Sequence, residues 1–199
     1  MQWPPIRKRL PCFQPAPTRD ITRRKCSSRW ATFLRLWSKF RLAAEYNPAS
    51  NLVWANLGDL YERQGKFNES IAAWEKVMKL DPYPWKIQLP LGYLYLEAHR
   101  PEDARAAFES FAAKLPPNPQ SALSPSIAAR LLRGQAAVAV ISGDFAAGQR
   151  LQDEALRLDA GSPDDWRQLA RIYASYGRTT DAQRAEQRAT SAAPSENQR

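Results

Sequence analysis

The sequence has little of what a catalytic or metal site needs. Among its 199 residues there is one histidine, His99, and there are two cysteines, Cys12 and Cys26. A single histidine without a cysteine, an aspartate or a second histidine at suitable spacing makes neither a metal site nor a catalytic triad. The cysteine spacing fits neither a zinc ribbon nor a redox Cys-x-x-Cys pair, so we interpret both as free thiols. We therefore expect no enzyme activity, no catalytic residue, no metal ion, no cofactor and no small-molecule ligand.

Long apolar runs are absent as well. No stretch reaches the roughly 18 apolar residues that a membrane-spanning helix needs. Glycine is scarce, with 8 residues, whereas Ala, Leu, Arg and Glu are abundant, which favours an all-α fold. These features, with the two free thiols, predict a cytoplasmic protein, and peripheral membrane association stays open as an alternative.

Acidic residues are nearly absent from the first quarter of the chain. Residues 1–48 contain eleven Lys or Arg and only Asp20 and Glu45, a net charge of 11 − 2 = +9. The rest holds 29 − 11 = 18 basic and 20 − 2 = 18 acidic residues, a net charge of zero. Residues 1–28 also contain five prolines and no apolar periodicity, so we predict a disordered basic leader. A transit peptide is the alternative, which the prolines disfavour. Because the charge is confined to this segment, we do not expect nucleic acid as the partner.

The most regular stretch, residues 51–84, is predicted to form two amphipathic helices joined by a turn at Gly65. We expect Gly58 to allow a second backbone to approach closely. The stretch recurs at a period of 34 residues, and a third and a fourth copy follow after ten extra residues. The markers of the first copy are Trp54, Leu57, Gly58, Tyr61, Gly65, Phe67, Trp74, Leu80 and Pro82.

With this period and this Trp, Leu-Gly, Tyr, Ala, Phe and Pro pattern, the chain resembles the tetratricopeptide repeat (TPR) family. The resemblance implies an all-α, right-handed α-solenoid of helix-turn-helix repeats. The copies span residues 51–84, 85–118, 129–162 and 163–196. The expected divisions are a leader (1–28), an amphipathic capping helix (29–47), repeats one and two (51–118), a linker loop (119–125), repeats three and four (126–196) and a tail (197–199).

Residues 28–47 carry an aromatic and apolar face, with Trp30, Phe33, Trp37 and Phe40 at helical spacing. One interpretation is the second helix of a partial repeat, which would cover repeat one. The alternative is a basic aromatic helix that lies on an anionic membrane.

The resemblance also implies which residues face a partner, because five positions of each first helix line the concave groove. In the four repeats these positions are Leu52, Ala55, Asp59, Glu62 and Arg63; Lys86, Leu89, Tyr93, Leu96 and Glu97; Arg130, Arg133, Ala137, Val140 and Ile141; and Asp164, Arg167, Arg171, Ala174 and Ser175. The chain lacks the carboxylate clamp of chaperone-binding members, because Ala55, Asp59 and Pro90 stand at clamp positions.

We single out seven of these residues as partner-binding: Lys86, Tyr93, Leu96, Arg130, Arg133, Arg167 and Arg171. The four arginines suit the carboxylates of an acidic segment, while Tyr93 and Leu96 would take an apolar side chain. The competing interpretation is that the arginines pair with Asp164 or other acids of the chain itself.

The predicted function is a non-catalytic scaffold or adaptor that binds a protein or peptide, with an acidic segment favoured. The alternative is an accessory domain of a membrane-associated complex, or of a glycosyltransferase or secretion assembly, docked through the basic aromatic helix.

Overall fold

The computed structural model describes residues 35–81, 85–114 and 124–192, without the side chains of Trp85 and Lys86. These residues contain helices and no strand, as the sequence predicts. The chain divides into two compact units, residues 1–48 and residues 49–199. The predicted leader 1–28, most of the linker 119–125 and the tail 197–199 lie outside the described residues, as do both cysteines.

In the first unit, residues 35–46 form one helix. Trp37 and Phe40 are half-buried and Ala44 is buried, whereas most of the other side chains are exposed. Arg41 stacks over the Trp37 ring at 5.1 Å from its centroid. Within residues 35–46 the helix therefore has a less accessible side and an exposed side, and residues 29–34 of the predicted capping helix lie outside the described residues.

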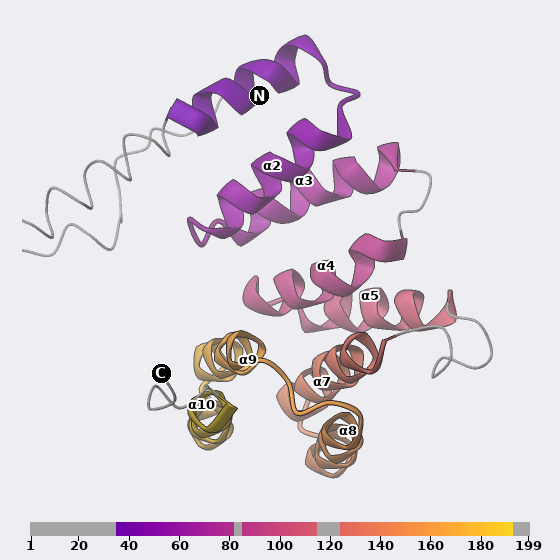
Figure 1. Cartoon of the computed structure of the whole chain (residues 1–199), viewed down its shortest axis with the longest axis vertical. Coiled ribbons are helices and arrows are strands. Elements are labelled where there is room, and N and C mark those ends of the chain that lie inside the picture. The colour runs from indigo at the N-terminus through magenta and orange to yellow at the C-terminus, as the bar shows by residue number, and fades with distance from the viewer. Residues whose placement is uncertain (1–34, 82–84, 115–123, 193–199) are drawn as a thin grey trace, which may run out of the picture. The chain divides into compact units, whose positions relative to one another are not determined.

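The described residues of the second unit form four helical hairpins (Figure 1). The first pairs α2 (Asn51–Glu62) with α3 (Phe67–Leu80), and the second pairs α4 (Trp85–Glu97) with α5 (Pro101–Ala113). The third pairs α7 (Pro125–Ile141) with α8 (Phe145–Leu158), and the fourth pairs α9 (Pro163–Ser175) with α10 (Thr179–Ala192). The helices α2, α4 and α9 begin at residues 51, 85 and 163, where three of the predicted copies begin, whereas α7 begins at Pro125, ahead of the third copy at residue 129 and inside the predicted loop 119–125.

In each hairpin, a residue with positive φ lies in the turn that follows the first helix. Gly65, Gly143 and Gly177 have φ values of 68°, 91° and 73°, and His99 takes the equivalent place in the second hairpin with φ 59°. A left-handed residue reverses the chain within a short turn, and glycine adopts this conformation at little cost. The period of the sequence therefore marks real turns.

Local signals also explain where some helices begin. Ser162 and Asp165 form a reciprocal capping box at the start of α9. Pro163 occupies the first turn, where its missing N–H costs nothing.

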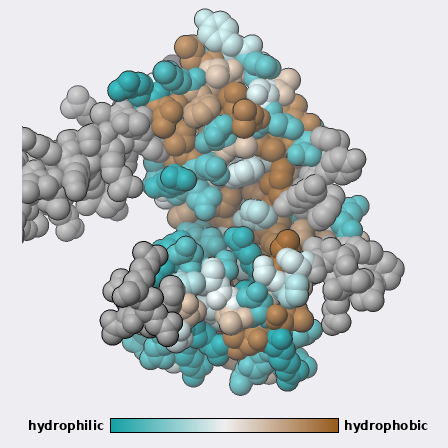
Figure 2. All heavy atoms as spheres, viewed as in Figure 1, coloured by the Kyte–Doolittle hydropathy of each residue, from teal (hydrophilic) through white to brown (hydrophobic). Residues whose placement is uncertain are grey.

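In α10, only Ala185 and Ala189 are buried, and Figure 2 shows mostly hydrophilic and neutral residues at this lower end of the view. A polar last helix suits the end of a helical repeat array.

The glycines of the first helices receive an aromatic ring, which corrects the expectation of a close backbone at Gly58. A Cβ on Gly58 would lie 2.6 Å from Nε1 of Trp74 in α3. Gly92 in α4 meets Phe108 of α5 in the same way. The missing side chain thus makes room for the aromatic residue of the second helix, and the first two hairpins close around this contact.

Neighbouring hairpins pack α3 against α4 and α5 against α7. The fourth hairpin departs from this order, because α9 contacts α7 and also α4, two hairpins earlier, rather than lying along α8. A single apolar core joins hairpins two to four, with Phe108, Leu169 and Ile172 almost fully buried in it. The fourth hairpin therefore lies over the first helix of the second.

Candidate partner-binding site

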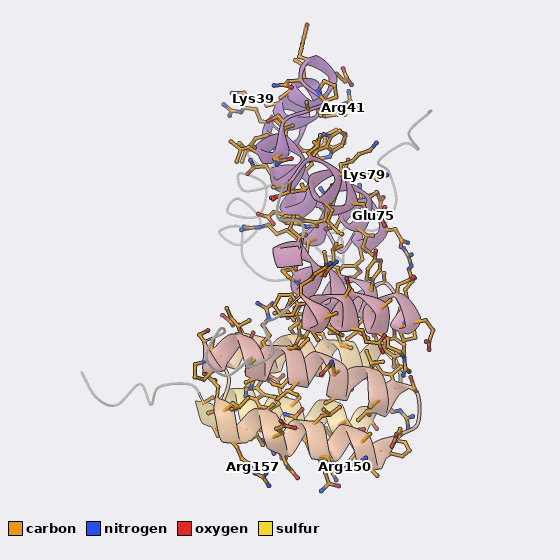
Figure 3. All side chains as sticks on the ribbon, turned by 90° about the vertical axis from the view of Figure 1, so that its right-hand side faces the viewer. Lys39, Arg41, Glu75, Lys79, Arg150 and Arg157 are labelled. Atoms are coloured by element: carbon orange, nitrogen blue, oxygen red, sulfur yellow. The ribbon has the colours of Figure 1, made fainter. Side chains whose placement is uncertain are left out.

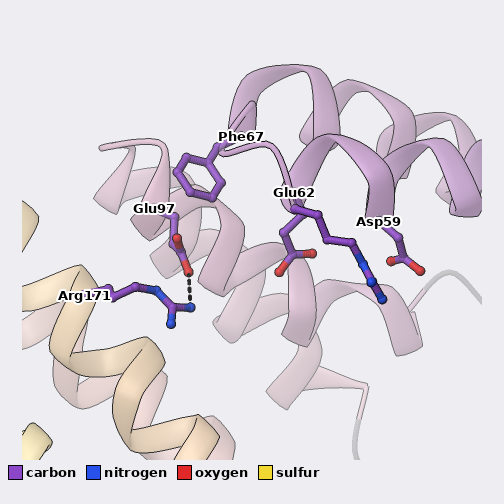
Figure 4. Close-up of a pocket in the computed structure, with 6 residues that line it drawn as sticks. Asp59, Glu62, Phe67, Glu97 and Arg171 are labelled. Carbon is purple, nitrogen blue, oxygen red and sulfur yellow. Dashed lines mark ion pairs between the residues drawn. The ribbon is translucent and has the colours of Figure 1, made fainter. Parts of the chain in front are cut away.

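Residues of three hairpins surround a cavity of about 490 Å³. Its lining residues are Asp59, Glu62, Arg63, Phe67, Glu97 and Arg171. Five of the six, all except Phe67, are among the groove positions that the TPR resemblance implies. Figure 4 shows Glu62 on α2 beside the space next to Phe67, Glu97 and Arg171, with Asp59 farther along the same helix. The structure thus brings groove positions of repeats one, two and four together around one open pocket.

The pocket has mixed charge, with three carboxylates and two guanidinium groups. Burial raises the pKa of the Glu62 carboxyl, and the negative charges of Glu97 and Asp59 raise it further. The negative charge of Glu97 has two partners. Arg171 Nη2 lies 3.8 Å from its Oε1, and the Gln168 amide donates a hydrogen bond of 3.2 Å to the same oxygen. The pocket can therefore hold a segment that offers both polar and charged groups.

The predicted apolar middle of the groove is part of the core. Tyr93 is 3% exposed and Leu96 is 0% exposed. The Tyr93 hydroxyl donates to the Arg130 carbonyl at 2.6 Å, and its ring meets Phe108 edge-on. The Tyr176 hydroxyl of the fourth hairpin donates to the Leu96 carbonyl at 3.1 Å. In this structure the fourth hairpin covers the surface where Tyr93 and Leu96 were expected to receive an apolar side chain.

The four arginines of the predicted site are each paired with an acid of the chain. Arg130 Nε lies 3.7 Å from Asp165, and its guanidinium stacks over the Tyr93 ring. Arg167 lies 2.8 Å from Asp164, one turn earlier on α9. Arg171 pairs with Glu97 as described above. These contacts match the competing interpretation, in which local acids neutralise the arginines.

Arg133 differs from the other three because it is buried, with 1% of its surface exposed. Its Nη1 donates to the Asp159 carbonyl at 3.0 Å, and its guanidinium lies over the Trp166 ring. The same group fills the space beside Gly161. Arg133 therefore holds the connection between α8 and α9. Lys86 lies in α4, and its side chain is outside the described set.

A second cavity, of about 400 Å³, opens between α8 and the fourth hairpin. Val140, Phe145, Trp166 and Tyr173 supply apolar surface, and Arg184 and Arg188 of α10 line it as well. The Gln152 amide nitrogen is buried there without a hydrogen-bond partner. The sequence does not reveal this cavity, because it exists only where α9 turns away from α8.

No group of three or more His, Cys, Asp or Glu in the described parts of the chain is arranged to hold a metal ion. Within the same parts, no helix has the length and apolarity to cross a bilayer.

The sequence comparisons identify one repeat. Residues 52–84 match the tetratricopeptide repeat family. BBSome complex member BBS4 of Xenopus tropicalis is 30% identical over 59 residues, which are 30% of this chain and 11% of that protein. The similarity thus concerns a short part of a much longer relative.

Solved structures with similar folds cover most of the described array. MamA has a TM-score of 0.55 at 16% identity, over 87% of this chain and 95% of that chain. PilF of Pseudomonas aeruginosa has a TM-score of 0.54 at 15% identity, over 84% and 72% of the two chains. PilW, a type IV pilus biogenesis factor, has a TM-score of 0.54 at 16% identity, over 87% and 78%. Identities this low establish the TPR-type solenoid fold alone.

Proposed function

We propose that this tetratricopeptide-repeat chain is a non-catalytic scaffold that binds a segment of a partner protein at the pocket of Asp59, Glu62 and Arg171. The TPR repeat at residues 52–84 and the TPR-type neighbours support a protein-interaction role. The observation that carries the location is the convergence of five groove positions around one open cavity. The expected cytoplasmic location belongs to this proposal. It rests on the interpretation of both cysteines as free thiols.

The partner segment is proposed to be acidic, with Arg167 and Arg171 as its contacts. Their side chains are 47% and 65% exposed, so they are the most accessible of the four predicted arginines. Each already has an intramolecular partner, Asp164 or Glu97. A carboxylate of the partner must therefore replace an existing ion pair, and the net gain from each exposed pair is about 1 kcal/mol or less.

Exchange of partners at Arg171 has a second consequence inside the pocket. When a carboxylate of the partner takes Arg171, Glu97 keeps the hydrogen bond from Gln168 but loses its guanidinium. Its negative charge then acts more strongly on Glu62, whose carboxyl is already crowded. Binding of an acidic segment would therefore raise the pKa of the Glu62 carboxyl further.

Three synthetic peptides of equal length test the proposal by fluorescence anisotropy. One contains Glu, Leu and Tyr, the second has Gln in place of Glu, and the third has Lys. The Glu peptide should bind best, and Arg167→Glu/Arg171→Glu should weaken it about tenfold, the effect of two lost exposed contacts plus repulsion. Arg133 is unsuitable for this variant, because its replacement would disturb the core.

The matched control is Arg150→Glu/Arg157→Glu, which makes the same charge change on α8. Both arginines are exposed, and Figure 3 shows them projecting from the outer side of the array. The control should bind the Glu peptide as the parent does. Tighter binding of the Lys peptide would reject the proposed preference for an acidic segment. It would indicate that the carboxylates of Asp59 and Glu62 select the partner. Equal, weak binding of all three peptides would reject the pocket as the site.

A second candidate is an accessory role in a membrane-associated or secretion assembly. It is favoured by the separate basic unit at residues 1–48 and by the likeness to PilW, which is itself a type IV pilus biogenesis factor. Affinity purification from membrane and soluble fractions, with the parent and the Arg167→Glu/Arg171→Glu variant side by side, tests it. Recovery of the same assembly proteins from both chains would assign the contact to another surface than the pocket.

A further inference from the structure

We propose that the helix of residues 35–46 lies flat on an anionic lipid bilayer through its exposed basic and apolar face. This face consists of Arg35, Leu36, Lys39, Leu42 and Tyr46. The inference goes beyond the peptide-binding proposal and does not depend on it.

The spacing of these residues places them on one side of the helix. Residues 35, 39, 42 and 46 follow one another at intervals of four, three and four, so they form a continuous stripe, and Leu36 borders it. Leu36 is 43% exposed, Leu42 is 52% exposed and Tyr46 is 83% exposed. Three large apolar side chains in twelve residues are thus left in contact with water.

This stripe is separate from the buried side of the same helix. Trp37, Phe40 and Ala44 form the less accessible side, and none of them belongs to the exposed face. The less accessible side and the exposed face therefore lie on different sides of the same helix. The two interpretations of residues 28–47 then cease to exclude each other, because they require different sides of one helix.

The positive charge of residues 1–48 favours a contact with an anionic surface. Residues 1–48 carry the whole net charge of the chain, 11 − 2 = +9, whereas residues 49–199 are balanced. The acidic residue of the helix, Glu45, is also exposed, but it pairs with Arg41 at 3.9 Å and is not one of the five residues of the face. Lys39 and Arg41 project from opposite sides of the helix in Figure 3. The exposed face itself is therefore purely basic and apolar.

An anionic bilayer is the surface that uses both properties. Leucine and tyrosine side chains bury in the boundary between headgroups and acyl chains, while lysine and arginine extend to the phosphate layer. Each basic residue near the surface adds electrostatic attraction. Nucleic acid would use the charges but leave Leu36 and Leu42 without a contact. The described part of the helix is too short to span a bilayer, so it would lie on the surface.

The experiment is co-sedimentation of the full chain with vesicles of phosphatidylcholine and phosphatidylserine, and with vesicles of phosphatidylcholine alone. The chain should bind the anionic vesicles and not the neutral ones, and added salt should weaken binding. Leu36→Ser/Leu42→Ser should lower the partition coefficient about tenfold, since two leucines no longer bury in the interface. Leu52→Ser/Leu80→Ser makes the same change at two exposed leucines of the array and should bind as the parent does.

Circular dichroism confirms that each variant keeps its helix content. Equal binding to neutral vesicles would overturn the proposal. Unchanged binding of Leu36→Ser/Leu42→Ser would also overturn it, because the basic residues alone would then account for the attraction. A loss of the same size in the Leu52→Ser/Leu80→Ser control would place the contact on the array instead.

Discussion

Gly134 of α7 lies directly against the ring of Phe108 in α5, so that a methyl group at Gly134 would lie 2.5 Å from Cζ of that ring. The contact joins the second hairpin to the third. Gly92 faces the same ring from α4. Phe108 is fully buried and thus occupies a space that two glycines leave open.

Gly134→Ala should destabilise the protein by about 1–3 kcal/mol, the usual cost of inserting a methylene into a packed core. The higher helix propensity of alanine, worth about 1 kcal/mol, offsets part of that cost. Urea unfolding followed by circular dichroism measures the change. Phe108→Leu in the same chain should reduce the penalty of Gly134→Ala, because leucine leaves room for the methyl group. Additive effects of the two substitutions would contradict the contact.

Arg133→Leu should cost about 3 kcal/mol of unfolding free energy. This is the low end for removing one partner of a buried pair, since Asp159 keeps one third of its side chain exposed. For a chain of this size, the melting temperature should fall by about 6–12 °C. Arg167→Leu, which removes an exposed arginine from an i, i+3 pair, should change stability by less than about 1 kcal/mol. Similar losses in both variants would show that Arg133 is not a structural residue.

Glu62→Gln should raise the melting temperature at pH 7 by less than about 3 °C. The pKa of the Glu62 carboxyl is raised in the folded state, so its charge opposes folding at any pH above that raised value. Below the ordinary value of 4.5 the carboxyl is protonated in both states, and the difference should disappear. Melting curves near pH 7 and pH 3.5 measure it. Glu109→Gln, which makes the same change at an exposed position of α5, is the matched control.

His99→Gly should leave stability within about 0.5 kcal/mol of the parent. Glycine relieves the left-handed conformation of His99, but it gains freedom in the unfolded chain and loses the ring contact with Tyr176, so the effects oppose each other. His99→Ala should cost about 1 kcal/mol, because it keeps the strained φ of 59° and loses the ring contact with Tyr176 at 4.6 Å. Thermal unfolding of both variants tests this, and a stabilising His99→Ala would disprove it.

The repeating pattern predicts the hairpins well because it reports local physics. Turn residues such as Gly65, Gly143 and Gly177 need a left-handed backbone, and helix periodicity places Leu57 and Tyr61 on one buried face. The family resemblance also places Asp59, Glu62, Arg63, Glu97 and Arg171 in the groove, and the pocket brings these five together. Gly134 carries no repeat marker, and its contact with Phe108 could not be read from the pattern.

The candidate site is where sequence reasoning reaches less far. Tyr93, Leu96 and Arg133 stand at groove positions, yet their side chains lie in the core. The reason is the packing of α9 against α4, which Tyr176, Gln168 and Arg171 reinforce through contacts to Leu96 and Glu97. Nothing in a repeat pattern encodes a contact that skips a repeat.

The sequence by itself determined the helices, their turns, their order and the confinement of the positive charge to residues 1–48, because each depends on neighbours along the chain. Only the tertiary structure decided which groove positions stay open. That choice depends on the angle between the third and fourth hairpins, which buries Tyr93 and Leu96 and leaves Glu62 and Arg171 beside the pocket. Such an angle follows from side chains far apart in sequence, packed into one core.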